Sequence, residues 1–334
     1  MTKVLLTGAG GFIGAHCVEY FLRTTDWDIV ALDSFRHKGN YSRLNEVDDL
    51  PNERVQIVHY DLSTPLSDPA IKKIGDIDIV LNMASDSAVE RSLTDPVFCL
   101  RNNYDIVVNM LEYARKVKPK VFFQVSTDEV FGDCPEGEAF AEWQTPCPSN
   151  PYAASKAAQE MVAISYWRTF GVPVVLTNTT NNIGEWQDCE KFLPKMIRKI
   201  ANGEEMPIYA NFDAAGTPSI GKRSYLYVKN HADVFVYLSK QPVSMYPHAE
   251  RPDRYNVCGD AEVGNLELAQ MVAGIMGKEV KYKLVPAEGI RPGYDKRYSL
   301  DGKKLLTMGW KPPILFTEGL QQAVRWTMNH AEWM

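Results

Sequence analysis

The chain has 334 residues, of which 45% are hydrophobic and 23% are charged, so it can bury a large core and divide into two lobes. The formal net charge of -6 argues against nucleic acid or another polyanion as the main partner, because such partners need a dense basic face. Apolar runs stay shorter than the roughly 20 residues of a membrane span, and the six cysteines and six histidines lack the spacing of a zinc site. We therefore expect a cytoplasmic protein that holds no metal and does not enter a membrane.

Short apolar runs alternate with amphipathic stretches through the first half of the chain. The runs that we expect to be strands are 4–7, 29–32, 55–60, 77–81, 121–125 and 174–177. Such alternation is typical of βαβ units and predicts an α/β protein with a Rossmann-type, doubly wound parallel sheet. After residue 180 the pattern becomes irregular and rich in turns, which indicates a smaller, interleaved C-terminal lobe.

The first predicted strand runs into a glycine-rich turn, after which we expect a helix that opens at Ala15. Gly8, Gly11 and Gly14 have the spacing GxxGxxG, a variant of the dinucleotide fingerprint. In that fingerprint, glycine lets the backbone approach a pyrophosphate at a helix N-terminus. The alternative is that the glycines only form a tight turn between strand and helix.

The second predicted strand ends at Asp33, about 20 residues beyond the last glycine of the turn. A carboxylate at this place can accept hydrogen bonds from the adenosine ribose hydroxyls, and it would repel a 2′-phosphate. The pattern therefore favours NAD over NADP. Arg36 lies nearby in the sequence and could neutralise the carboxylate, which keeps NADP as an alternative.

Two adjacent carboxylates follow the strand predicted at 121–125, within the segment Ser-Thr-Asp-Glu-Val-Phe-Gly. Neighbouring side chains on a regular strand point to opposite faces, so Asp128 and Glu129 can serve one site only if the backbone has left the ladder. Two close carboxyls separate in pKa, which leaves one protonated as an acid and the other charged as a base. The alternative is that both residues cap a turn or cover a surface.

A second group of candidate residues opens a predicted helix. Ser149 or Asn150 can cap this helix, with Pro151 in its first turn. Tyr152 and Lys156 are four residues apart and share one face. Positive charge from the lysine and from an oxidised nicotinamide ring would favour the tyrosine phenolate, which could then act as a base. The same spacing also occurs by chance on surface helices.

Taken in order, these motifs resemble the extended short-chain dehydrogenase/reductases, and the similarity runs over nearly the whole chain. The segment from Thr127 to Gly132 is similar to the TDEVYG motif of nucleotide-diphosphate-sugar 4,6-dehydratases. The resemblance implies bound NAD and a nucleotide-diphosphate hexose substrate of the dTDP- or UDP-glucose type, which becomes a 4-keto-6-deoxy sugar. It also implies a homodimer formed through helices near 95–114 and 151–170.

The reaction suggests a role for each catalytic candidate. Tyr152, next to Lys156 on the helix, takes the proton of the C4 hydroxyl while hydride passes from C4 to NAD, and Thr127 holds that oxygen in line. Glu129 then removes the C5 proton, and protonated Asp128 gives a proton to the departing C6 hydroxyl. Hydride finally returns to C6.

The resemblance assigns further residues to the two ligands. The expected cofactor-binding residues are Gly8, Gly11, Phe12, Ile13, Gly14, Asp33, Asp61, Leu62, Ala84, Ser85, Asn103, Ser126, Tyr152 and Lys156. The expected substrate-binding residues are Asp86, Arg91, Asn182, Lys191, Phe192, Pro207, Tyr209, Arg223, Arg291 and Tyr294. We expect an NAD-binding domain at 1–180 and about 226–258, and a nucleotide-sugar lobe at about 181–225 and 259–334.

The sequence departs from the family pattern at Asn82, Ser87 and Asn178, and the loop at 210–222 is longer than usual. The nucleotide carried by the substrate therefore stays open. A nucleotide-sugar 4-epimerase or a uronate decarboxylase of the same superfamily would use the same tyrosine and lysine. The non-enzymatic alternative is an NAD-binding sensor or scaffold.

Overall fold

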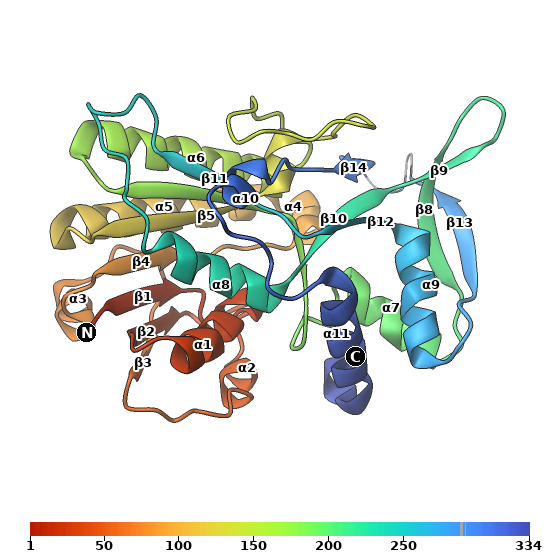
Figure 1. The fold of residues 1–334 in the computed structure, drawn as a ribbon, viewed down its shortest axis with the longest axis horizontal. Coiled ribbons are helices and arrows are strands. Elements are labelled where there is room, and N and C mark those ends of the chain that lie inside the picture. The colour runs from red at the N-terminus through yellow and green to blue at the C-terminus, as the bar shows by residue number, and fades with distance from the viewer. Residues whose placement is uncertain (288–289, 291) are drawn as a thin grey trace.

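Seven parallel strands form the central sheet of the protein, and helices cover both of its faces (Figure 1). This computed structural model describes residues 1–287, 290 and 292–334 of the chain. The strands of the sheet are β1 (Lys3–Thr7), β2 (Asp28–Asp33), β3 (Val55–His59), β4 (Ile79–Asn82), β5 (Val121–Thr127), β6 (Val174–Thr179) and β11 (Asp253–Val257). Their order is β11-β6-β5-β4-β1-β2-β3, and every neighbouring pair is parallel. The predicted Rossmann-type, doubly wound sheet is confirmed.

Alternate side chains of the strands pack against opposite layers of helices, as the pleat of a buried parallel sheet requires. The helices on one face are α1 (Phe12–Thr24), α2 (Tyr41–Asn45), α8 (Val228–Leu238) and α10 (Lys303–Thr307). The other face carries α3 (Asp68–Ile74), α5 (Pro96–Val117) and α6 (Pro151–Phe170), with α4 (Val89–Thr94) packed on α5 and α6. Val4 and Leu6 of β1 belong to the apolar cluster of the first face, whereas Leu5 belongs to that of the second.

The other elements form a smaller part of the protein around a third apolar cluster. Its strands are β7 (Asn181–Ile183), β8 (Met206–Phe212), β9 (Pro218–Ile220), β10 (Lys222–Tyr227), β12 (Ala261–Gly264), β13 (Tyr282–Pro286) and β14 (Arg297–Tyr298). They form one sheet of order β12-β10-β14, with β7 paired to β10, and another of order β13-β8-β9. Three helices complete this part: α7 (Phe192–Ala201), α9 (Asn265–Met276) and α11 (Phe316–Asn329).

The chain crosses between the two parts more than once. After β10 it returns to the large sheet with α8 and β11, and it leaves that sheet again through β12 and α9. Leu305 of α10, Trp310 and Trp333 pack once more in a cluster of the large sheet. The long loop at 210–222 is the β8–β9 hairpin, which projects from the end of the molecule opposite the N-terminus (Figure 1).

The glycine-rich turn leads into α1 earlier than the sequence pattern suggests. The expectation that this helix opens at Ala15 is wrong, because α1 begins at Phe12. Gly11 is extended, and its N–H donates to the carbonyl oxygen of Gly8 over 3.0 Å. Its own carbonyl accepts the N–H of Ala15, so the first helical hydrogen bond already starts at the last residue of the turn.

The helix α6 begins at Pro151, as predicted. Of the two candidate caps, Asn150 is the one used, because its side-chain oxygen accepts the N–H of Ala153 over 2.9 Å. Proline suits the first helical position, since its missing N–H would have no partner there.

A buried ion pair between β11 and α6 is connected to the end of β5 by hydrogen bonds. The guanidinium of Arg254 lies 2.6 Å from a carboxylate oxygen of Glu160, and the two side chains are 1% and 0% exposed. Arg254 also donates to the side-chain oxygen of Asn178. The amide nitrogen of Asn178 in turn donates to Glu160 over 2.8 Å and to the carbonyl of Thr127 over 3.0 Å. Asn178, a departure from the family pattern, thus holds the last residue of β5.

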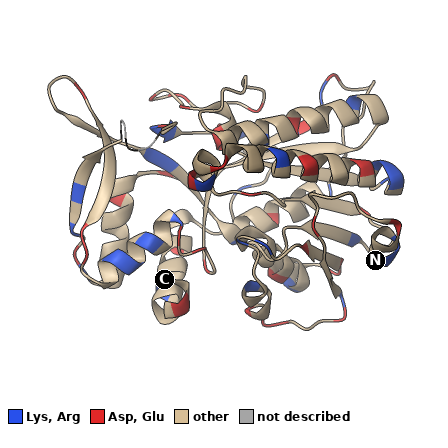
Figure 2. Cartoon of the chain, turned by 180° about the vertical axis from the view of Figure 1, so that it is seen from behind, with Lys and Arg blue, Asp and Glu red and all other residues tan. Residues whose placement is uncertain are grey.

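Charges of both signs are interspersed along the helices seen from behind (Figure 2). Within the described residues, no helix has both the length and the apolar character needed to cross a membrane.

We expect Glu160→Ala to lower the free energy of unfolding by about 3–5 kcal/mol, because it leaves the guanidinium of Arg254 buried without its counter-charge. Urea denaturation followed by circular dichroism measures the change. Lys303→Ala, which removes an exposed ion pair with Asp301, is the control and should change stability far less. An equally small effect of Glu160→Ala would contradict the structural role of this pair.

Candidate active site

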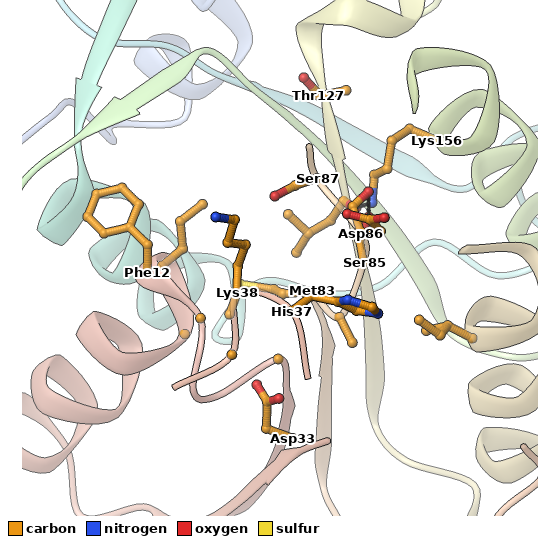
Figure 3. A pocket seen from close by; sticks show the side chains of 18 of the residues that line it. Phe12, Asp33, His37, Lys38, Met83, Ser85, Asp86, Ser87, Thr127 and Lys156 are labelled. Carbon is orange, nitrogen blue, oxygen red and sulfur yellow. Dashed lines mark hydrogen bonds between the residues drawn. The ribbon is translucent and has the colours of Figure 1, made fainter. Parts of the chain in front are cut away.

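A cavity of about 340 Å³ lies at the carboxyl ends of β1 and β4, where the strand order of the sheet reverses. Open α/β sheets bind their ligands at such a switch point. Figure 3 shows Asp33 at one end of the cavity and Thr127 and Lys156 at the other. The predicted cofactor-binding residues that line it are Gly8, Gly11, Phe12, Ile13, Gly14, Asp33, Asp61, Leu62, Ala84, Ser85, Ser126, Tyr152 and Lys156. Asn103 lies behind the wall, where its side chain bonds the main chain of Asp86.

The glycine-rich turn fits a dinucleotide because it has no room for side chains. A Cβ atom on Gly14 would lie 2.1 Å from the carbonyl oxygen of Gly8. Gly8 itself has a φ of +73°, a conformation that favours glycine. No side chain caps α1 at Gly11, so the helix N-terminus can present its amides to a pyrophosphate. This cradle is what a bound NAD requires.

Asp33 shapes the loop that follows β2 as well as facing the cavity. Its two carboxylate oxygens accept the N–H groups of Gly10 and Phe35 over 2.8 and 2.7 Å. Burial raises the pKa of this carboxyl, and the backbone donors act in the opposite direction. Arg36, which could have neutralised it, donates instead to Asp61 over 2.7 Å. The arrangement agrees with NAD rather than NADP.

Tyr152 and Lys156 are both buried at the far end of this cavity. The ammonium of Lys156 donates to the carbonyl of Val125 and to Gln159, each over 2.7 Å, and burial lowers its pKa to about 8. Burial raises the pKa of Tyr152 well above its ordinary value, and the negative charge of Glu129 adds to the effect. Burial and the nearby carboxyls therefore favour the neutral form of this tyrosine.

The two adjacent carboxyls occupy a 3₁₀ turn (Asp128–Phe131) that follows directly on β5. The backbone leaves the ladder after Thr127, so Asp128 and Glu129 can both line the cavity that contains Tyr152. An oxygen of Asp128 accepts the hydroxyl of Thr127 over 3.0 Å. Burial and the charge of Glu129 raise the pKa of Asp128 to about 7.

Glu129 has a different set of neighbours. Burial raises the pKa of this carboxyl, while a hydrogen bond from Asn150 and the positive charges of Arg223 and Lys191 lower it. The two adjacent carboxyls therefore differ in what stabilises their charge. Such a pair can provide an acid and a base in the same pH range.

A second cavity, of about 740 Å³, adjoins the first and shares Glu129, Asn182 and Lys191 with it. The volume is ordinary for a pocket that binds a small molecule. The predicted substrate-binding residues that line it are Arg91, Asn182, Lys191, Phe192, Pro207, Tyr209, Arg223 and Tyr294. Asp86 lines the first cavity instead. Arg291 lies outside the described residues, and its assignment stays a prediction.

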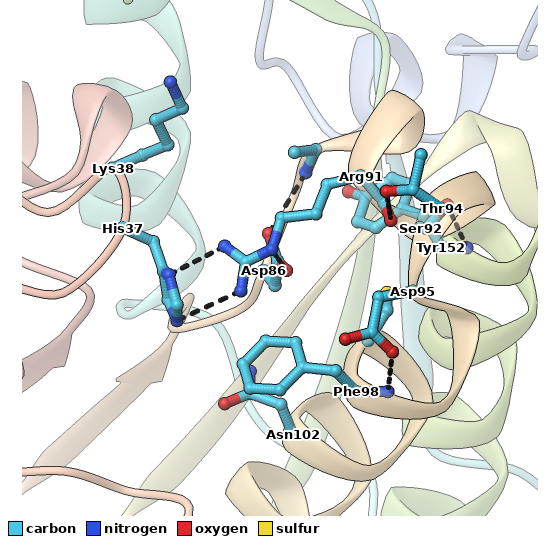
Figure 4. A network of polar contacts seen from close by, with 12 residues as sticks. His37, Lys38, Asp86, Arg91, Ser92, Thr94, Asp95, Phe98, Asn102 and Tyr152 are labelled. Atoms are coloured by element: carbon cyan, nitrogen blue, oxygen red, sulfur yellow. Dashed lines mark hydrogen bonds and ion pairs between the residues drawn. The ribbon is translucent and has the colours of Figure 1, made fainter.

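Arg91 lines the second cavity and joins α4 to the loop after β2 (Figure 4). Its guanidinium lies 3.5 Å from the carboxylate of Asp86 and 2.7 Å from Nδ1 of His37. It also lies over the ring of Phe98, 4.6 Å from the centroid. His37 lines both cavities, and sequence reasoning missed it because nothing local to its loop indicates a partner 54 residues away.

Arg223 is held at the wall of the second cavity by main-chain oxygens. It donates to the carbonyls of Asp295 and Lys296 over 2.7 and 2.8 Å, and it lies over the ring of Tyr298. The side chain of Asp295 accepts the hydroxyl of Tyr298 in turn. Sequence reasoning found the arginine but missed both of these partners, which lie more than 70 residues further along the chain.

Sequence reasoning also missed Lys38 and Asp188, which line both cavities. The ammonium of Lys38 donates to Asp188 over 3.2 Å and to Glu190 over 2.6 Å. These bonds connect the loop after β2 to the segment that leads into α7. A lone lysine in a loop gives no sequence signal for such a contact.

Known proteins share both the sequence pattern and the fold of this chain. The family profile described as "NAD dependent epimerase/dehydratase family" matches residues 4–258. The "dTDP-glucose 4,6-dehydratase 1" of Escherichia coli strain K12 is 30% identical over 359 residues, which cover 99% of this chain and 94% of that protein.

Two solved structures have similar folds. The dTDP-glucose 4,6-dehydratase DesIV of Streptomyces venezuelae, with NAD bound, has a TM-score of 0.85 and 28% identity, and the match covers 99% of this chain and 98% of that one. The UDP-glucose 4-epimerase of Thermus thermophilus, in complex with NAD, has a TM-score of 0.85 and 27% identity, over 98% of this chain and 100% of that one. The glycine-rich cradle, the paired carboxyls and these similarities lead to one conclusion. The chain belongs to the NAD-dependent epimerase/dehydratase family.

Proposed function

We propose that the chain is an NAD-dependent 4,6-dehydratase of a nucleotide-diphosphate hexose. The observation that carries the proposal is that Asp128, Glu129 and Tyr152 line one cavity. A 4-epimerase can work with the tyrosine alone, because only C4 is oxidised and reduced. Removal of water from C5 and C6 needs a further base and a further acid, and the two carboxyls can supply them. The relatives named dTDP-glucose 4,6-dehydratase support this choice.

The first step is oxidation at C4. When bound, NAD supplies a positive charge and carries the hydride that leaves C4 and later returns to C6. Tyr152 takes the proton of the C4 hydroxyl, and Thr127 holds that oxygen in line. Lys156 provides the chain's own positive charge on the helix face of the tyrosine. A tyrosine whose pKa burial has raised suits this role only when positive charge comes close, so proton transfer is tied to the bound cofactor.

The second step is the loss of water. The ketone at C4 acidifies the C5 proton, which Glu129 removes, while Asp128 gives its proton to the C6 hydroxyl as it departs. A pKa of about 7 keeps much of Asp128 protonated near neutral pH, as an acid requires. After hydride has returned to C6, the proton held by Glu129 goes back to C5 and completes the 4-keto-6-deoxy sugar.

The two cavities match two ligands. We assign the first to NAD, in a domain formed by residues 1–180 and about 226–258. We assign the second to the nucleotide sugar, in a lobe formed by about 181–225 and 259–334. Since Glu129 and Lys191 border both cavities, the hexose would lie where they meet.

We further propose a cytoplasmic homodimer formed through α5 and α6. These neighbouring helices expose large apolar side chains, which a partner copy could cover. They are Val97, Leu100, Tyr104, Met161 and Phe170. The cytoplasmic location agrees with six cysteines that are all free thiols.

Incubation with a panel of dTDP-, UDP-, CDP- and GDP-hexoses, followed by mass spectrometry, tests the activity. We expect a product lighter than its substrate by one water, and a 4-keto absorbance in alkali. A product of unchanged mass would favour the epimerase, and loss of carbon dioxide would favour the decarboxylase. Bound NAD without turnover of any sugar would favour the sensor or scaffold.

Two substitutions separate the two steps. Tyr152→Phe should abolish C4 oxidation, because the base is gone, and NADH should not form in a single turnover. Glu129→Gln should still form NADH but should block elimination, because C5 keeps its proton. Dehydration by Glu129→Gln at the wild-type rate would contradict the assignment of the C5 base.

The pH profile tests Asp128. Its raised pKa keeps the carboxyl protonated up to neutral pH, so the dehydration rate should fall as pH rises above about 7, because less acid remains. Asp128→Asn should lower the rate about 10²–10⁴-fold and remove this alkaline limb. Rates of turnover measured between about pH 5 and 9 check both effects, and an alkaline limb that persists in Asp128→Asn would show that another group is the acid.

A further inference from the structure

Asn150 makes two hydrogen bonds that join the helix of Tyr152 to the acidic turn. Its side-chain oxygen accepts the N–H of Ala153 over 2.9 Å and caps α6. Its side-chain nitrogen donates to Oε2 of Glu129 over 3.2 Å. The residue is 6% exposed, so water competes little for either bond.

The cap determines which end of the amide faces the acidic turn. The oxygen and the nitrogen of an asparagine amide are told apart by their partners. A backbone N–H can be met only by the oxygen, so the nitrogen must face Glu129. A nitrogen donor favours the charged form of a carboxyl, because the charged form accepts the hydrogen bond.

The bond from Asn150 is one of the differences between the surroundings of the two carboxyls. Burial raises the pKa of Glu129, and the bond from Asn150 is the first influence against it, ahead of Arg223 and Lys191, while Asp295 acts in the same direction as burial. Asp128 receives its side-chain hydrogen bond from the hydroxyl of Thr127. An amide that bonds only one carboxyl of an adjacent pair makes the two unequal.

We propose that Asn150 is a positioning residue that selects Glu129, rather than its neighbour, as the base at C5. The inference rests on the proposed dehydratase function. The same amide fixes the start of α6, two residues before Tyr152, so the proton acceptors of the two successive steps keep a set separation. Aspartate caps a helix as well as asparagine does, but it offers Glu129 no donor.

Asn150→Asp therefore keeps the cap and replaces the donor to Glu129 with a negatively charged carboxylate oxygen. We expect its melting temperature to fall, because a further carboxylate is buried beside Glu129, and NADH formation by the folded variant in a single turnover to stay within about twofold. Wash-in of solvent deuterium at C5 should slow about tenfold or more at about pH 7. The acid limb of its pH profile should move to higher pH, because the added negative charge raises the pKa of the base.

Two matched variants accompany this test. Asn150→Ser keeps a capping oxygen without adding charge, and it should slow C5 exchange in the same sense but less. Ser67→Asp adds the same charge at the cap of α3, outside both cavities, and should leave both steps unchanged. Equal slowing of NADH formation and C5 exchange in Asn150→Asp would overturn the proposal, because the residue would then act only through the helix. An unmoved acid limb would overturn it as well.

A titration that needs no turnover separates this inference from the proposed function. Infrared difference spectra of protein with ¹³C-labelled glutamate carboxyls, taken against Glu129→Gln, report the ionisation of Glu129 alone. Its pKa should be higher in Asn150→Asp than in the wild type, and equal values would overturn the role of Asn150. If the wild type dehydrates no nucleotide sugar, the proposed function fails, yet this titration still decides whether Asn150 keeps Glu129 charged.

Discussion

The burial of two adjacent carboxyls at the end of β5 is the constraint on which the site depends. Carboxyls lose much of their hydration when buried, so their charge persists only where a hydrogen bond or a positive charge replaces water. On a regular strand, two neighbouring side chains point to opposite faces and could not both line one cavity. The 3₁₀ turn after Thr127 allows Asp128 and Glu129 to do so. The carbonyl of Thr127 accepts a hydrogen bond from the side chain of Asn178. Asn178 is held in turn by its bonds to Glu160 and Arg254, which form a buried ion pair. The site thus rests on a buried, hydrogen-bonded polar network.

Burial of these ionisable groups lowers the stability of the folded protein but gives them the pKa values that acid–base catalysis needs. When burial raises the pKa of a carboxyl, the folded state loses stability as pH rises from the pKa of the unfolded state, about 4, to the pKa of the folded state. For Asp128 the folded-state pKa is about 7, so the loss of stability builds up as pH rises to about 7 and is complete above it. Tyr152 and Lys156 show the same pattern, because burial pushes each towards its neutral form. Near neutral pH the tyrosine is therefore neutral, whereas the lysine, with a pKa of about 8, keeps its positive charge.

The sequence predicted those parts of the structure that depend on local pattern. Six of the seven strands of the central sheet, the glycine-rich turn and the start of α6 follow from apolar periodicity, glycine spacing and a cap followed by proline, whereas β11 was not predicted. The sequence places the start of α1 too late, because the cap is an extended glycine, Gly11, and no capping side chain marks the position in the sequence. Contacts between distant segments could not be predicted in this way. Asn178 is informative only once Arg254 is known to lie beside it, and Lys38 only once Asp188 is.

Those distant contacts are also what join the two cavities. Arg43 is buried, and its guanidinium donates to the carbonyl of Gly10 in the glycine-rich turn and to that of Trp186 in the segment before α7. Lys38 bonds Asp188 in the same segment, which ends at the N-terminus of α7. The wall of the first cavity is therefore built partly from residues that also border the second. The shared wall keeps the two cavities in contact, which suits a reaction whose hydride leaves the sugar and returns to it before the product departs.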